Sequence, residues 1–291
     1  MSHVQIEPGG RAAALQGVRR IGCVSFLNAR PLIEGLEEIA ESSGVGLQFD
    51  VPSQLLGRLE SGAVDVALCP VIDYYRSSVA LEIVPVGQIG CHGSTMTVKL
   101  VSRVPIDRID EVHADTDSHT SVALLQMVLH DRCGYRPLVK PYDARHQPLA
   151  AASTSPQSVL LIGDKVVRDA PSREVFPYQI DLGQAWYELT GLPFVFAIWM
   201  AREGTDLGDL PEMLNACRLE NVQRIDQIVR RHAANHQWPI DLARHYLGDL
   251  LKFGVGPSQL EAIEHFARRA FELDLIPAPT PLRLRGAKLL R

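Results

Sequence analysis

The amino-acid sequence predicts an α/β protein of two lobes, each a sheet flanked by helices, with a ligand cleft between the lobes. Short apolar runs typical of buried strands alternate with segments of helical periodicity along the chain. The chain has 291 residues, which exceeds one average domain, so two domains are expected. Small polar residues also stand where several predicted strands end, and open α/β sheets bind ligands at that edge.

The composition indicates neither nucleic acid nor membrane as a partner. Charged residues make up 22% and apolar residues 46% of the chain, and the formal net charge is -5. These values are typical of a water-soluble protein. The 29 basic residues are scattered rather than gathered into a patch. No apolar run approaches the roughly 20 residues that a membrane span requires.

The cysteines and the N-terminal segment predict a cytoplasmic protein. The five cysteines are widely spaced and include no CxxC pair, so we expect reduced core residues. Residues 1–18 lack the apolar centre of a secretory signal and are predicted to be a loosely ordered extension. The sequence does not indicate an oligomeric state.

The first strand–helix junction supplies Asn28. Residues 21–26 form an apolar run typical of a strand, and Pro31 opens a helix predicted over 32–42. Asn28 lies between them, at the carboxyl end of the strand, where its amide would project into the cleft. Alternatively, Asn28 caps the helix that Pro31 begins.

Two more polar clusters follow before residue 103. A buried strand ending at residues 69–71 repeats the geometry of the first junction, which makes Pro70 and Val71 binding candidates. A glycine-marked connection, with Gly87, Gly90 and Gly93, is predicted to bring together Ser94, Thr95 and Thr97. The other elements predicted here are strands at 46–51, 84–89 and 96–102 and helices at 52–61 and 73–77.

A helix start at Ser118-His119-Thr120-Ser121 predicts an anion site. An apolar stripe at 122–129 marks the helix that follows directly. Its first turn presents unpaired N–H groups and a partial positive charge, and the hydroxyls add further donors. Such a site suits a carboxylate or a phosphate. Serine and threonine are also favoured caps of any helix, so the cap remains the alternative.

A third junction follows the predicted strand at 158–162. It ends at Gly163 and Asp164, and Asp164 is either a ligand contact or the cap of a helix at 165–168. A later helix ends at Gly191, and a strand at 194–200 is predicted to return to the first lobe. Residues 210–269 are predicted to form helices on the outside of the fold, and the segment after 276 is predicted to be an extended arm. The predicted division is therefore an extension at 1–18, a first lobe at 19–103 plus 195–291, and a second lobe at 104–194.

Common motifs of metal and nucleotide chemistry are missing from the sequence. It contains no GxGxxG after a strand, no GxxxxGK[ST], no HExxH and no GxSxG, and the ten histidines show no metal-ligand spacing. We therefore expect no metal and no cofactor. Apart from Asp164, the polar clusters found at strand ends and loops are neutral. They predict a cleft that holds a small anionic, hydroxylated molecule by hydrogen bonds from neutral groups and by helix N-termini.

Four segments together resemble the chorismate dehydratase family of menaquinone biosynthesis, over about residues 19–270. These are FLNARPL at 26–32, ADTDSHTSVALL at 114–125, VLLIGDKVV at 159–167 and DLGQAWYELTGLPFVFAIW at 181–199. The resemblance implies a two-lobed fold like the type II periplasmic solute-binding proteins. It also implies a cytoplasmic, cofactor-independent enzyme that converts chorismate to 3-[(1-carboxyvinyl)oxy]benzoate and water in the futalosine pathway.

The resemblance also assigns catalytic roles. The motif asparagine falls on Asn28, and the catalytic hydroxyl, usually a serine in MSxxxxS, falls on Thr97 within MTVKLVS at 96–102. Threonine keeps the hydroxyl and adds a methyl group, which predicts a slightly narrower pocket. Asn28 and Thr97 would hydrogen-bond the reacting region, while the substrate's own side-chain carboxylate takes the proton. His119 is the competing candidate base.

Two alternative functions follow from the same fold. One is 1,4-dihydroxy-6-naphthoate synthase, an enzyme of the same pathway. The other is a non-catalytic solute-binding or sensor protein for a small carboxylate.

Overall fold

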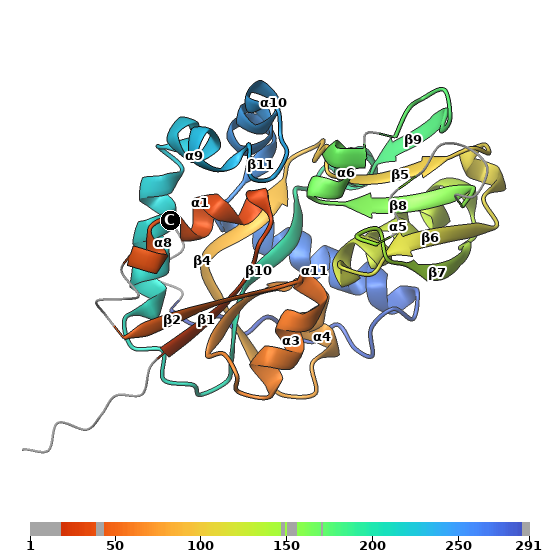
Figure 1. The fold of residues 1–291 in the computed structure, drawn as a ribbon. Coiled ribbons are helices and arrows are strands. Elements are labelled where there is room, and N and C mark those ends of the chain that lie inside the picture. Colours follow the sequence, from red (N-terminus) through yellow and green to blue (C-terminus); the bar gives the residue numbers. More distant parts are fainter. Residues whose placement is uncertain (1–18, 39–43, 147–148, 150–155, 170, 287–291) are drawn as a thin grey trace, which may run out of the picture.

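The computed structural model describes residues 19–38, 44–146, 149, 156–169 and 171–286, and the predicted extension at 1–18 lies outside them. The described chain forms two sheets with helices packed around them (Figure 1). The chain crosses between the sheets twice, after residue 91 and before residue 194.

The first sheet has six strands in the order β11-β4-β10-β3-β1-β2. Parallel pairing joins β1 to β2 and to β3, whereas β10 runs antiparallel to both β3 and β4. The parallel strands β1 and β3 end side by side, which places the residues after them at one edge. The strands are β1 (Arg19–Val24), β2 (Val45–Asp50), β3 (Val66–Pro70), β4 (Leu81–Cys91), β10 (Phe194–Arg202) and β11 (Leu251–Lys252).

The second sheet has five strands in the order β7-β6-β8-β5-β9. They are β5 (Val98–Ser102), β6 (Glu111–Asp115), β7 (Leu138–Tyr142), β8 (Ser158–Ile162) and β9 (Tyr178–Asp181). The sequence division placed Val98–Ser102 in the first lobe, but this strand pairs antiparallel with β8 and β9. The second sheet therefore begins at β5, before the predicted boundary at residue 104.

The helices cover both sheets, and α11 contacts both β10 and α5, so that it packs against both lobes. They are η1 (Leu27–Ala29), α1 (Arg30–Ile33), α3 (Pro52–Glu60), α4 (Asp73–Arg76), η2 (Ile106–Arg108), α5 (His119–Cys133), α6 (Asp164–Asp169), α7 (Leu182–Thr190), α8 (Leu210–Asn221), α9 (Ile225–His232), α10 (Ile240–His245), the π-helical turn η3 (Tyr246–Leu250) and α11 (Pro257–Glu272).

Local sequence signals explain where the longest second-lobe helix begins and ends. The Ser118 side chain accepts a hydrogen bond from the Ser121 N–H at the start of α5. Gly134, which follows the helix, has the left-handed φ of 76° that glycine adopts without steric cost. The apolar face between these ends is buried in a core cluster that includes residues of both sheets, such as Ile21 and Leu100. The two lobes therefore share the larger core, while the second lobe has a further cluster of its own that includes Val101 and Val159.

Two segments differ from their predicted form. Gly87 and Gly90 lie inside β4 rather than in a flexible connection, and a Cβ on Gly90 would come within 2.4 Å of the Phe194 carbonyl oxygen. Glycine is therefore required there by the close approach of β10. The C-terminal segment is extended, as predicted, but it packs on β4. Ile83 donates its N–H to the Arg283 carbonyl and accepts from the Arg285 N–H, at 2.8 and 2.9 Å.

Candidate functional site

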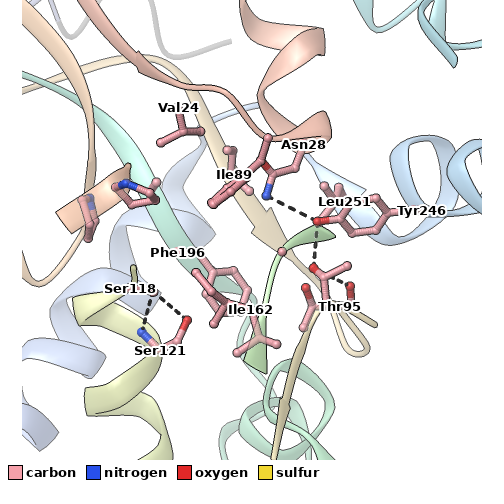
Figure 2. Close-up of a pocket in the computed structure, with 17 residues that line it drawn as sticks. Val24, Asn28, Ile89, Thr95, Ser118, Ser121, Ile162, Phe196, Tyr246 and Leu251 are labelled. Atoms are coloured by element: carbon pink, nitrogen blue, oxygen red, sulfur yellow. Dashed lines mark hydrogen bonds between the residues drawn. The ribbon is translucent and has the colours of Figure 1, made fainter. Parts of the chain in front are cut away.

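A cavity of about 60 Å³ lies between the lobes, lined by strand ends from both sheets (Figure 2). Small-molecule sites typically measure about 300–1,000 Å³, so this cavity is smaller than a typical site. The cavity is lined by Val24, Phe26, Asn28, Pro52, Pro70, Ile89, Thr95, Thr97, Val98, Ser118, Ser121, Ile162, Gly163, Phe196, Ala197, Tyr246 and Leu251. Residues from the three predicted junctions therefore meet in one place.

Asn28 points into this cavity and does not cap a helix. Neither η1 nor α1 has a side-chain cap, so the alternative interpretation of Asn28 does not apply. Its Nδ2 donates to the hydroxyl of Tyr246 at 3.4 Å. Its Oδ1 is buried and has no hydrogen-bond partner among the described residues. Asn28 thus offers the cavity an unused acceptor.

The Thr97 hydroxyl is held by a loop that Asp181 organises. The Asp181 carboxylate accepts hydrogen bonds from the Ser94 hydroxyl at 2.8 Å and from the N–H of Met96 at 2.6 Å. These bonds support the left-handed backbone of Met96, whose φ is 63°. Thr97 Oγ1 then lies 2.8 Å from the Tyr246 hydroxyl oxygen. Ser94 does not line the cavity but fixes the loop that carries Thr97.

The helix start at Ser118 is at once a cap and part of the cavity wall. The Ser118 hydroxyl accepts from the Ser121 N–H at 3.2 Å and donates to the Ser121 hydroxyl at 2.9 Å. Both side chains line the cavity. The two interpretations of this motif therefore hold together, and the Ser121 hydroxyl faces the ligand space at the positive end of a 15-residue helix.

Three of the other candidates join the two lobes instead of lining the cavity. The His119 imidazole Nδ1 lies 2.8 Å from Asp73 Oδ1 in α4, and the Thr120 hydroxyl accepts from the Ile72 N–H at 3.3 Å. Asp164 reaches the first lobe as well, where its carboxylate accepts from the Leu27 N–H at 3.4 Å.

Val71 lies inside the first lobe, where its buried N–H donates to the Phe196 carbonyl at 3.0 Å. Of the residues predicted to bind substrate, Pro70, Ser118, Ser121 and Gly163 line the cavity. Val71, Ser94, His119, Thr120 and Asp164 are not part of its wall. These five residues make contacts that support the wall from behind.

Tyr246 is a polar residue of the cavity wall that sequence reasoning missed. It comes from the π-helical turn η3, is 1% exposed, and stacks on Trp238 with ring centroids 4.8 Å apart. Burial raises the pKa of its hydroxyl, and the hydrogen bond with Thr97 opposes that rise only in part. No motif marks Tyr246, because it stands in a segment with the periodicity of surface helices.

The polar groups in the described cavity wall are neutral. Its side chains are hydroxyls, one amide and apolar groups, and include no carboxylate, imidazole, guanidinium or ammonium. Charged groups lie behind the wall, where the Asp181 carboxylate accepts from the Thr95 N–H at 3.1 Å. Lys165 also lies there, with Nζ 5.8 Å from the ring centroid of Phe26. It is buried and paired with Asp115 and Asp117 at 2.6 and 2.7 Å. Burial raises the pKa of Asp115.

The described part of the chain contains neither a cluster of metal-ligand side chains nor a membrane-spanning helix. There, no three His, Cys, Asp or Glu side chains come together in a way that could hold a metal ion. The described helices are too short or too polar to cross a bilayer.

The two sheets with a cavity between them define a protein with the fold of the periplasmic binding proteins. The chain is similar to the aliphatic sulphonate binding protein SsuA from Escherichia coli, with a TM-score of 0.63 and 13% identity over 91% of this chain and 95% of that one. A Candida albicans protein described as having the generic periplasmic binding protein fold matches with a TM-score of 0.59 and 10% identity, over 92% and 98% of the two chains. At these identities the likeness concerns the fold alone.

The chain belongs to the menaquinone biosynthesis family, whose model matches residues 19–272. One relative is the chorismate dehydratase of Thermus thermophilus, which is 27% identical over 242 residues. That match covers 78% of this chain and 86% of the relative. The predicted family and fold are thereby confirmed.

Proposed function

We propose that the protein is a chorismate dehydratase that converts chorismate to 3-[(1-carboxyvinyl)oxy]benzoate and water. The observation that carries the proposal is the convergence of Asn28, Thr97 and the Ser118 helix start on one interlobe cavity. The relative from Thermus thermophilus supports the same activity. We propose a cytoplasmic location with it, which the five unpaired cysteines support.

One substrate carboxylate would bind at the start of α5. The Ser121 hydroxyl lies there, and the first-turn N–H groups of a helix carry a partial positive charge. Binding of the carboxylate at this position requires no cation in the wall, because the aligned peptide dipoles and the hydroxyls attract its negative charge. It would leave the ring facing Asn28 and Thr97 across the cavity.

The reaction breaks the C–H bond at the carbon bearing the enolpyruvyl ether and the C–O bond of the neighbouring hydroxyl. The electron pair of the C–H bond completes the aromatic ring, and the hydroxyl leaves with the proton as water. Thr97 would donate to the leaving oxygen, and the buried Oδ1 of Asn28 would accept from its O–H. The enzyme then acts by holding one conformer and stabilising charge as it develops.

The substrate's own side-chain carboxylate is the proposed base. His119 does not line the cavity and is paired with Asp73. The wall of the described cavity offers no carboxylate or imidazole in its place. An internal base of this kind is consistent with a wall of neutral groups.

A direct assay tests the proposal. Purified protein is incubated with chorismate without added cofactor, and the products are separated and weighed by mass spectrometry. We expect chorismate to disappear as an aromatic product lighter by one water forms. Binding of chorismate without product would instead indicate a solute-binding protein with the same fold. A parallel incubation with the cyclised futalosine-derived precursor tests for 1,4-dihydroxy-6-naphthoate synthase.

A further inference from the structure

The Tyr246 hydroxyl joins the side chains of Asn28 and Thr97. The Asn28 Nδ2 can only donate, so the Tyr246 oxygen accepts there, at 3.4 Å. The Tyr246 hydroxyl oxygen also lies 2.8 Å from Thr97 Oγ1, where either oxygen can be the donor. When Tyr246 donates, the Thr97 proton is left for another acceptor, and the Thr95 carbonyl at 3.4 Å lies well beyond the usual O–H···O distance of about 2.8 Å.

We propose that Tyr246 donates its hydroxyl proton to Thr97 and is thereby a positioning residue, which orients the Thr97 hydroxyl as a donor and the Asn28 carbonyl oxygen as an acceptor toward the substrate. The inference rests on the proposed function and deepens it. With its amide N–H turned to Tyr246, Asn28 presents the buried, unpartnered Oδ1 instead. Without the tyrosine hydroxyl, both side chains lose the contact that selects their orientation.

Contacts from both lobes hold Tyr246 in place. Its ring stacks on Trp238 with an interplanar angle of 15°, and Trp238 Nε1 donates to Asp164 Oδ1 at 2.9 Å. The other oxygen of Asp164 accepts from the Leu27 N–H, one residue before Asn28, and lies 2.8 Å from His236 Nδ1. One carboxylate of the second lobe therefore ties together the segment that carries Asn28 and the ring that supports Tyr246.

The π-helical turn and the burial of the hydroxyl fit this role. A π turn inserts one extra residue into a helix and often marks a functional position. Here the turn directs Tyr246 inward, to the cavity wall. Because burial raises the pKa of Tyr246, the phenol keeps its proton at neutral pH and remains a donor to Thr97.

Hydroxyl deletion with a matched control tests the proposal. In Tyr246→Phe the ring and its stacking stay, so we expect kcat to fall on the order of 10- to 100-fold while KM changes by less than about 3-fold. Tyr75→Phe is the control, because Tyr75 is also buried and its hydroxyl has no partner among the described residues. This control variant should turn over chorismate at the wild-type rate.

A double-mutant cycle separates positioning from simple packing. If Tyr246 acts through the Thr97 hydroxyl, Tyr246→Phe should lower kcat by less than about 3-fold further in a Thr97→Val background. Full additivity of the two losses, or a Tyr246→Phe variant as active as the wild type, would overturn the positioning role and leave the proposed function standing. Absence of product from the wild-type protein would refute the proposed function, and the inference with it.

Discussion

Replacing Asn28 by alanine should separate activity from stability. The side chain has two polar ends in the structure, a donor bonded to Tyr246 at 3.4 Å and a buried acceptor without a partner in the described chain. If the acceptor binds the reacting hydroxyl, its loss should lower kcat by about 10²-fold, as for a lost transition-state hydrogen bond. That ratio corresponds to about 2.7 kcal/mol.

The stability of the same variant should change little or even increase. An unsatisfied buried acceptor costs about 1–3 kcal/mol, and alanine removes it. The hydrogen bond lost with Nδ2 is long and contributes about 0.5 kcal/mol, and the small space left behind offsets part of the gain. We therefore expect a Tm equal to that of the wild type or a few degrees above it.

Initial rates of chorismate loss and thermal unfolding measured on one preparation test both halves of this prediction. Asn235→Ala is a suitable control, because Asn235 is exposed and lies outside the cavity. Near-normal turnover of the Asn28 variant would refute the catalytic assignment. A large loss of Tm alongside the loss of rate would instead show that Asn28 supports the fold.

Three further outcomes are expected. Thr97→Ser should keep kcat within about 3-fold of the wild type and Thr97→Val should lose about 10²-fold, since only the first retains the hydroxyl; equal rates for both would exclude a role for it. Burial lowers the pKa of His232 in the folded protein, so as pH falls through about 6.5 the unfolded chain takes up a proton at this residue before the folded chain does. The Tm should therefore decrease below that pH, and it should decrease less steeply with pH in the His232→Gln variant than in the wild type. Of the five thiols, Cys133 should react first with a thiol reagent in the native protein, because it alone is partly exposed. Burial also raises the pKa of Cys23 and Cys217 to about 12, which lowers their reactivity. Simultaneous reaction of several thiols would contradict this prediction.

Features set by neighbouring residues were predictable from the sequence. The strand at 158–162 has the predicted bounds. A short apolar run between polar segments is typical of a buried strand, so this one could be recognised from its own residues. The helix that starts after Ser118 follows from the cap and from the apolar stripe. The wall positions of Asn28 and Thr97 follow from the strand ends that precede or follow them.

Features that depend on distant contacts were not predictable. Tyr246 meets Thr97 across 149 residues of sequence, and nothing near Tyr246 signals that contact. The antiparallel partners of the strand at Val98–Ser102 lie beyond residue 157, so the strand was assigned to the wrong sheet. Asp164 looked like a cap or a ligand contact because its partner Trp238 lies 74 residues away.

The C-terminal segment also affects how the molecule presents itself to other chains. The last strand of the first sheet, β11, pairs with β4 only at Gly90 and Cys91, which leaves the beginning of β4 without a neighbouring strand on that side. Residues 283–285 bridge to Ile83 there and take up its N–H and carbonyl groups. An unpaired strand edge is a template for self-association. Because the proline-rich tail occupies this edge of β4, a neighbouring copy of the chain cannot pair with it there.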